Sequence, residues 1–165
     1  MHLGCLHGNS AAYGEHMTSP PLDDSEMARW IAWKQANDAV SAAVAREILA
    51  ASALSVPDFS VLSRVIENGA GRMPQQKLGL MLGWQRARLS RQLSRMADRG
   101  LLTRKDGPAG RRVIVATDAG RDALATARPA HARAVRRALL SPAAEDRKTF
   151  WTAVQAIADP TRNST

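Results

Sequence analysis

The sequence predicts a mainly α-helical protein with one short two-stranded hairpin set between its helices. Alanine, leucine and arginine dominate the composition, and β-branched runs are scarce, which favours helices. Two helices joined by a short glycine turn precede two short strands whose connection contains glycine and proline. This order is the pattern of a winged helix-turn-helix with a two-stranded β-wing. A chain of 165 residues is long enough to bury a core.

We divide the chain into five segments by composition and periodicity. Residues 1–21 are rich in Gly, Ser, Pro and His without any period, so we expect a disordered segment, in part an expression scar if Met17 is the natural start. Residues 22–56 hold a long helix for dimerisation, and 57–117 hold the winged lobe. Residues 118–159 hold further dimerisation helices, and 160–165 a disordered tail.

The first half of the chain predicts two helices. Asp23, Asp24 or Ser25 can cap a helix that runs to about Ser52, a length often found in helices that build interfaces. Pro57 fits the first turn of the next helix. That helix has a buried face and a stop at Gly69; the face consists of Phe59, Leu62, Val65 and Ile66.

Within the predicted winged lobe, a loop is expected from Gly71 to Pro74. A short helix follows with Leu78, Met81 and Leu82, and Gly83 ends it. The next helix, about 84–99, buries Leu89, Leu93 and Met96 and stops at Gly100. Residues 101–105 and 111–115 are the expected strands of the wing.

The last part of the chain predicts two more helices. Thr117 and Asp118 cap the first, and Pro129 is expected to kink or break it. Ser141 and Pro142 are expected to open the second. Its apolar face consists of Phe150, Trp151, Val154, Ile157 and Ala158.

The charge is concentrated in the predicted lobe. The chain has 23 basic and 15 acidic residues, and ten of the basic residues but only two acidic ones lie between Lys77 and Arg112. A basic block in an otherwise neutral chain is expected of a protein that binds nucleic acid. A merely solvated arginine-rich surface is the alternative.

The outer face of the second lobe helix favours nucleic acid. Outside its apolar stripe it carries hydrogen-bonding and cationic side chains and no acid before Asp98, and this set includes Gln92 and Ser94. An ordinary exposed helix would mix acids and bases. Arginine can pair with guanine and glutamine with adenine in a major groove. We therefore predict that this helix reads base edges through Gln85, Arg86, Arg88, Ser90 and Arg91.

The wing and its surroundings provide a second set of candidate contacts. One of the two arginines at positions 111 and 112 is expected to face the protein, because strand side chains alternate. The other can enter the minor groove. The full set expected to contact phosphates or the minor groove is Lys77, Arg95, Arg104, Lys105, Arg111 and Arg112.

From Lys77 to Gly120 the chain resembles the DNA-binding lobe of the MarR family of bacterial regulators. The matching residues are Leu78, Leu82, Leu89, Leu93, Met96, Arg99, Gly100, Leu101, Arg111, Arg112, Thr117 and Gly120. The resemblance extends over residues 22–158. It implies a homodimer built from the first and the last two helices, and a regulator, often a repressor, that binds a pseudo-palindromic operator in double-stranded DNA.

The resemblance also implies release from DNA by a small phenolic or drug-like effector. Such a ligand binds between the dimer lobe and the DNA-binding lobe. Trp30 and Trp33 are candidates to line this pocket, or else aromatics of the core or the dimer interface.

Other function classes are less well supported. The sequence lacks a phosphate-binding glycine loop, a nucleophile elbow and metal-ligand spacing, so we expect neither an enzyme nor a bound cofactor or metal. No apolar run approaches the roughly 18–20 residues of a membrane span. With one cysteine, Cys5, and no apparent signal peptide, we expect a cytoplasmic protein. A non-specific architectural DNA-binding protein and a helical module for an acidic protein partner remain the alternatives.

Overall fold

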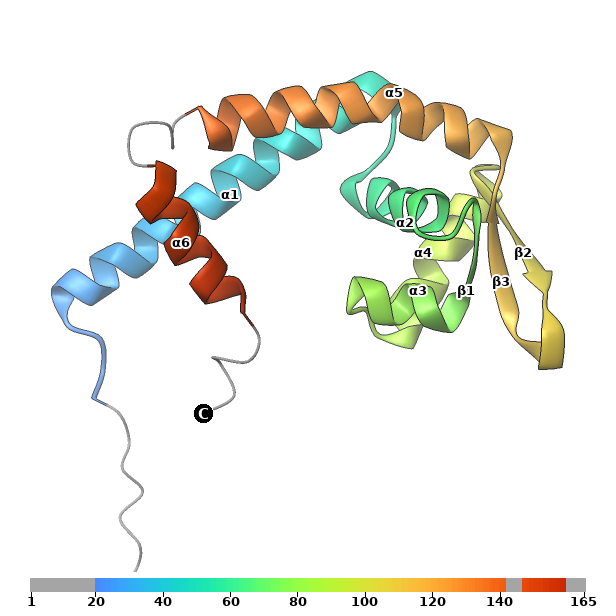
Figure 1. Cartoon of the computed structure of the whole chain (residues 1–165), viewed down its shortest axis with the longest axis horizontal. Helices are drawn as coiled ribbons and strands as arrows, with labels where there is room; N and C mark the ends of the chain where they lie inside the picture. The colour runs from blue at the N-terminus through green and yellow to red at the C-terminus, as the bar shows by residue number, and fades with distance from the viewer. Residues whose placement is uncertain (1–19, 142–146, 160–165) are drawn as a thin grey trace, which may run out of the picture. The chain divides into compact units, whose positions relative to one another are not determined.

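Six α-helices and three strands make up the described part of the chain, which in this computed structural model is residues 20–141 and 147–159. The helices are α1 (Asp24–Ser52), α2 (Val56–Glu67), α3 (Gln75–Leu82), α4 (Arg86–Asp98), α5 (Asp118–Val135) and α6 (Arg147–Ala158). The strands are β1 (Arg72–Pro74), β2 (Leu102–Asp106) and β3 (Arg112–Ala116). The chain divides into two compact units within α1, between Lys34 and Gln35. The mainly helical winged fold that the sequence predicts is confirmed (Figure 1).

The sheet of the winged lobe has a third strand that the sequence analysis placed in a loop. Residues 72–74 form β1, which pairs antiparallel with β3 and gives the strand order β1-β3-β2. Met73 is buried between exposed Arg72 and Pro74. Three residues are too few to show a periodic pattern in the sequence, so the sequence alone does not distinguish this strand from a loop. Pro74 is tolerated because β1 is an edge strand.

The core lies between the sheet and the helices of the winged lobe. Leu89, Leu93 and Met96 of α4 are buried as predicted, and they pack with Leu62 of α2 and Ile114 of β3. Two residues of the predicted α2 face, Phe59 and Ile66, are only half-buried but also pack on this core. Met81 of α3 is exposed.

The helix starts follow their capping residues. Asp23 and Glu26 accept hydrogen bonds from each other's backbone amides at the start of α1. Thr117 caps α5, because its Oγ1 accepts from the Gly120 amide at 3.1 Å and donates to the Gly100 carbonyl at 2.6 Å. A Cβ on Gly120 would lie 2.1 Å from the Leu101 carbonyl oxygen, so the close approach of α5 to this loop requires glycine.

Helix α5 continues through Pro129, where the sequence predicted a kink or break. The helix extends to Val135 and is followed by a π-helical turn, Arg136–Leu140. The side chains of Ala127, Ala130 and Ala134 are buried along one face of α5. This packing compensates for the backbone hydrogen bond that Pro129 cannot donate. The predicted cap at Pro142 and the N-terminal segment 1–19 lie outside the described residues.

Within the described ranges, no single helix is long and apolar enough to cross a membrane. Helices α1 and α2 meet the criteria of length and composition only when they are taken together. The same ranges contain no cluster of three or more side chains suited to hold a metal ion.

A buried carboxylate joins α2 to α4. Asp58 is 1% exposed, and its Oδ1 accepts from Gln92 Nε2 at 2.6 Å. Its Oδ2 accepts from Arg99 Nη1 at 2.7 Å and from the Ser55 amide at 2.9 Å, the latter completing a capping box. Gln92 therefore faces inward, and the prediction that it belongs to the outer face of α4 is wrong.

We expect Asp58→Ala to lower the free energy of unfolding by roughly 2–3 kcal/mol, because it leaves Gln92 and the Ser55 amide without their buried acceptor. Urea denaturation measures this change. Glu67→Ala on the same helix is the matched control, since it removes an ion pair with Arg128 in which both side chains are about half exposed. Its cost should stay below about 1 kcal/mol. Equal costs for the two variants would show that Asp58 does not hold the helices together.

Candidate nucleic-acid interface

Helices α3 and α4 form the helix-turn-helix. Gly83 has a left-handed backbone conformation, with φ +62°, and ends α3. Its amide donates a hydrogen bond to the Leu80 carbonyl at 3.2 Å. The Trp84 amide donates to the Gly79 carbonyl at 3.1 Å, which fixes the chain between the helices. Leu78 of α3 and Leu89 of α4 are buried in one cluster. The start of α4 is thus rigidly placed next to α3.

The outer face of α4 carries the predicted base-reading residues. Gln85, Arg86, Arg88 and Arg91 are exposed, and Ser90 is half-buried. Arg88 lies with its guanidinium carbon 4.5 Å from the ring centre of Trp84. Asp98, the last residue of the helix, is its single acid, so the exposed face carries a continuous positive charge.

Both arginines of the wing are exposed. Arg111 precedes β3, after the 3₁₀ turn Pro108–Gly110, so strand alternation does not turn it inward as the sequence analysis expected. Arg112 is the first residue of β3 and lies opposite Asp106 of β2, with Nε and Oδ1 3.7 Å apart. Lys105, on β2, is exposed as well.

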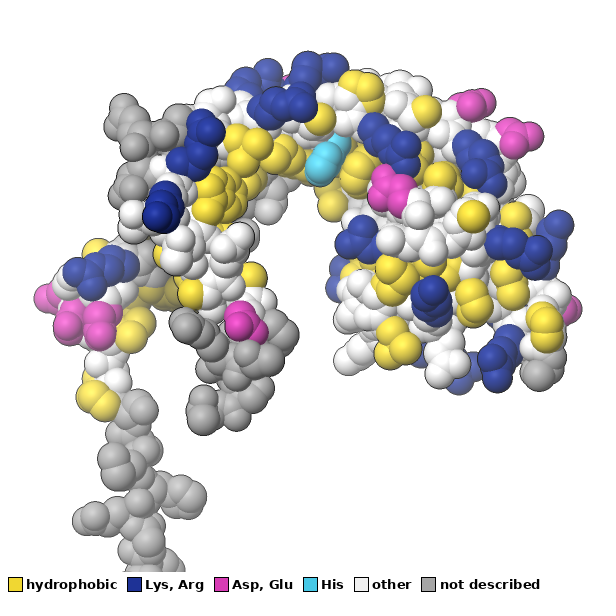
Figure 2. Space-filling view, viewed as in Figure 1, with side chains coloured by type: hydrophobic (Ala, Val, Ile, Leu, Met, Phe, Trp, Pro, Cys, Tyr) yellow, Lys and Arg dark blue, Asp and Glu magenta, His cyan; other side chains and the backbone are white. Residues whose placement is uncertain are grey.

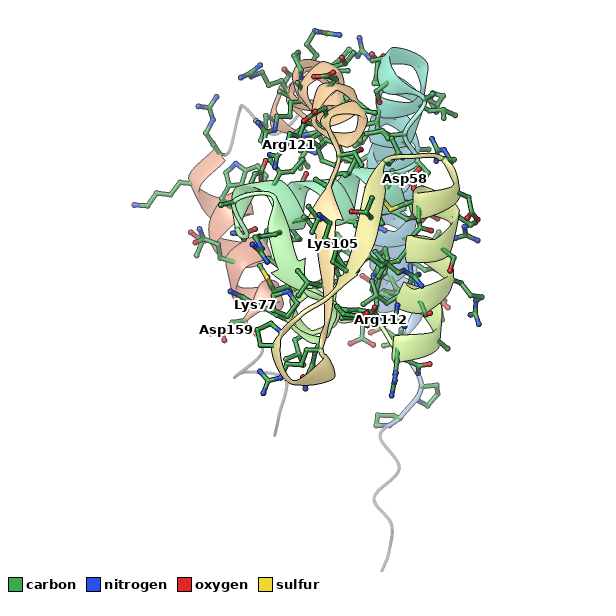
Figure 3. The ribbon with its side chains drawn as sticks, turned by 90° about the vertical axis from the view of Figure 1, so that its right-hand side faces the viewer. Asp58, Lys77, Lys105, Arg112, Arg121 and Asp159 are labelled. Atoms are coloured by element: carbon green, nitrogen blue, oxygen red, sulfur yellow. The ribbon has the colours of Figure 1, made fainter. Side chains whose placement is uncertain are left out.

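A cleft joins the wing to the start of α3 and α4. Its volume is about 910 Å³, and its cationic lining consists of Lys77, Arg86, Arg111 and Arg112. Figure 3 shows Lys77 and Arg112 at one end of the lobe, and Asp58 at the opposite end. Basic side chains, dark blue in Figure 2, also mark this part of the molecular surface. The structure therefore brings the wing arginines and the first turn of α4 to the same side.

Arg104 and Arg95, both predicted phosphate contacts, donate hydrogen bonds within the protein. Arg104 Nη2 donates to the Ser90 carbonyl at 2.7 Å and to Ser94 Oγ at 3.1 Å, so Arg104 holds β2 against α4. Its Nε is buried without a hydrogen-bond partner. Arg95 donates through Nη2 to Oε1 of Gln92, and its charge stays exposed on α4.

A second cavity, of about 410 Å³, lies between the C-terminal half of α1, α2 and α5. The rings of Phe59 and His131 stack at 4.9 Å in its lining, and the buried hydroxyl of Ser63 has no hydrogen-bond partner. Arg64 and Arg128 add positive charge, although Arg128 also pairs with Glu67 at 2.7 Å. Two aromatic rings, one unpaired hydroxyl and cationic side chains suit an aromatic anion.

The sequence analysis did not identify this cavity. It proposed Trp30 and Trp33, which are 48% and 45% exposed and line neither cavity. Phe59 and His131 are 72 positions apart, so no local motif joins them. The cation of Lys34 lies 5.4 Å from the Trp30 ring centre.

Comparison with known proteins places the fold. A family model described as a domain of unknown function (DUF7343) matches residues 57–117. No curated protein matches the sequence. Many solved structures match, and three of them represent the set.

AbsC, a MarR family transcriptional regulator from Streptomyces coelicolor, superposes with a TM-score of 0.77 at 24% identity, over 88% of this chain and 99% of AbsC. Sco3205, a MarR family transcriptional regulator from the same organism, was solved in complex with DNA. It superposes with a TM-score of 0.75 at 20% identity, over 84% of this chain and 89% of Sco3205. CouR from Rhodococcus jostii RHA1, bound to p-coumaroyl-CoA, superposes with a TM-score of 0.64 at 22% identity, over 80% of this chain and 92% of CouR. The winged helix-turn-helix fold of these regulators is therefore the fold of this chain, as its sequence resemblance implied.

Proposed function

We propose that this chain, which has the fold of the MarR-family transcriptional regulators, is a sequence-specific double-stranded DNA-binding regulator that acts as a repressor. The observation that carries the proposal is the exposed face of α4, which holds cationic and hydrogen-bonding side chains and lies beside the wing arginines. Neighbouring folds are regulators, and one was solved on DNA. A repressor of this kind acts by occupying its operator, without catalysis.

In this proposal α4 enters the major groove. Gln85, Arg86, Arg88 and Arg91 face the bases, where arginine matches the two acceptors of guanine and glutamine the acceptor and donor of adenine. Ser90 is half-buried and contributes at the edge of this surface. Arg111 and Arg112 of the wing line the same cleft as Arg86, and in this proposal they contact the adjacent minor groove.

The phosphate contacts hold the lobe in register. Lys77, Lys105 and Arg95 are exposed at the edges of the proposed interface, where the backbone of the duplex is the nearest partner. Arg104 supports the interface from within by holding β2 on α4.

Arg91→Ala is expected to reduce the ratio of operator affinity to random-duplex affinity, because a lost bidentate base contact costs about 1–3 kcal/mol at one position. Lys105→Ala should leave that ratio nearly unchanged and lower the log–log salt slope by roughly one. Fluorescence anisotropy with a selected operator and a random duplex at several salt concentrations measures both quantities.

Both variants must keep the melting temperature of the unchanged protein for this comparison to hold. If the two substitutions reduced both affinities by the same factor, α4 would not read sequence. A non-specific architectural DNA-binding protein would then be the better description. Absence of any duplex binding would favour the interaction module for an acidic partner.

We also propose a homodimer built from α1, α5 and α6. Helix α1 exposes Trp30, Ile31 and Trp33, and α6 exposes Ile157 at 61%. No residue of α6 is buried in the single chain. Exposed aromatic and aliphatic side chains at this density mark surfaces that a partner covers. Two-fold symmetry would present two α4 helices to two half-sites of a pseudo-palindromic operator.

Sedimentation equilibrium at micromolar concentration is expected to give twice the chain mass of 17.8 kDa. Trp33→Asp should shift the distribution toward monomer, since it places a charge on a surface that becomes buried. Lys105→Asp, which changes a charge on the wing, is the control and should leave the mass unchanged. A monomer for the unchanged protein would remove the case for a palindromic operator.

We propose that a small phenolic carboxylate binds the second cavity and releases the DNA. This cavity offers the stacked rings of Phe59 and His131, the unpaired Ser63 hydroxyl and the cations of Arg64 and Arg128. It also lies on α2, the helix that holds α4 through Asp58. The ligand of CouR contains a phenolic acyl group, which is similar chemistry on a similar fold.

Hydroxybenzoate is expected to bind this cavity and to weaken DNA binding by the same factor by which DNA weakens hydroxybenzoate binding, because the coupling is reciprocal. Titration calorimetry with and without operator measures both affinities. Ser63→Val should weaken hydroxybenzoate binding and leave the affinity for DNA alone unchanged. If Trp30→Ala and Trp33→Ala abolished binding while Ser63→Val did not, the ligand would lie at the tryptophans instead.

A further inference from the structure

The stacked pair of Trp84 and Arg88 distinguishes one arginine of α4 from the others. The Arg88 guanidinium carbon lies 4.5 Å from the centre of the Trp84 ring, inside the range of a cation–π interaction. The described contacts include no ion pair, hydrogen bond or ring contact of the Arg86 or Arg91 side chain. Among the exposed arginines of the predicted reading set, Arg88 is thus the one that a contact within the protein orients.

Trp84 is a rigid platform for this contact. Its side chain is half-buried and packs on the hydrophobic core, and its amide donates to the Gly79 carbonyl at 3.1 Å. It follows Gly83, whose left-handed conformation sets the direction of the chain. A ring held at both its backbone and its apolar face does not need to be ordered when a ligand binds.

The stack leaves the hydrogen-bonding capacity of Arg88 unused. When a guanidinium lies with its flat face on a ring, its N–H groups lie in the plane of the guanidinium and point outward from its edge. The two interactions therefore do not compete. An arginine that is already stacked loses less side-chain freedom when its edge engages a planar partner.

We propose that Trp84 is a positioning residue that presents the edge of Arg88 to the N7 and O6 acceptors of a guanine in the major groove. Arg88 lies in the first turn of α4, the part of a recognition helix that contacts base edges. Guanine is the base that offers two acceptors at the spacing of this fork. This inference rests on the proposed function, and it assigns one base identity to one side chain.

The test uses the full chain and a duplex selected from a random-sequence library. Each guanine of that duplex is replaced in turn by 7-deazaguanine, which lacks the N7 acceptor. One guanine per half-site should then lose at least about fivefold in affinity for the unchanged protein. For Arg88→Ala the same replacement should change nothing at that guanine, while the other guanines keep their effects.

Variants of Trp84 separate positioning from packing. Trp84→Met keeps an apolar side chain without a ring, and it should weaken operator binding about two- to fivefold. The same substitution in the Arg88→Ala background should have no further effect on operator binding. The affinity for random duplex should be the same for Trp84→Met and for Arg88→Ala. Trp84→Phe retains an aromatic face and should recover part of the loss. Melting temperatures verify that each variant is folded.

The outcomes distinguish this inference from the proposed function. If Trp84→Met and Arg88→Ala were additive on the operator, or if Trp84→Met weakened the contribution of every guanine alike, Trp84 would only support the fold and the inference would be overturned. Selection that enriched no sequence at all would overturn the proposed function first. A guanine that responded to Arg91→Ala instead of Arg88→Ala would leave the regulator intact and overturn the assignment.

Discussion

The geometry of the proposed interface depends on one buried carboxylate. Asp58 caps the start of α2 and at the same time accepts hydrogen bonds from Gln92 and Arg99, both contributed by α4 or its C-terminal cap. A buried charge is tolerated only where its lone pairs are occupied, and here the Ser55 amide, Gln92 and Arg99 donate three hydrogen bonds to the two carboxylate oxygens. The tilt of α4 relative to α2 is therefore set by polar contacts as well as by the apolar stripe.

Helix α2 connects the small cavity beside α1 and α5 with the larger cleft beside the wing. Phe59, the residue after Asp58, lines the smaller cavity, and Asp58 itself contacts α4, whose first turn lines the larger one. A displacement of α2 at Phe59 cannot leave Asp58 in place, because adjacent residues of a helix move together. The structure thus joins a candidate ligand cavity to α4 through covalent neighbours and one hydrogen bond.

The sequence predicted the features that depend on local pattern and missed those that depend on contacts between residues far apart in the chain. The helices, the wing strands and the stripe of Leu89, Leu93 and Met96 follow from spacing, and the structure confirms them. Gln92 was assigned to the outer face because it is polar, although it lies between Leu89 and Met96 at buried spacing. Only its partner Asp58, 34 positions earlier, explains why an amide belongs there.

The candidate site divides in the same way. The exposed cations of α4 and the wing could be predicted, because charge and capping glycines are visible in the sequence. The inward bonding of Arg104, the stack of Arg88 on Trp84 and the cavity around Ser63 could not be predicted, because each needs elements that meet only in the fold. Strand β1 was missed because its pairing partner β3 lies about 40 residues later in the chain.

Strand β1 also has a consequence for the behaviour of the chain at high concentration. An exposed hairpin with a free edge can pair with the hairpin of another molecule and begin aggregation. Here β1 covers one side of β3, is only three residues long, and ends in Pro74. The opposite edge, β2, carries Lys105 and Asp106. The wing can therefore project its arginines into solvent without offering its backbone as a template for self-association.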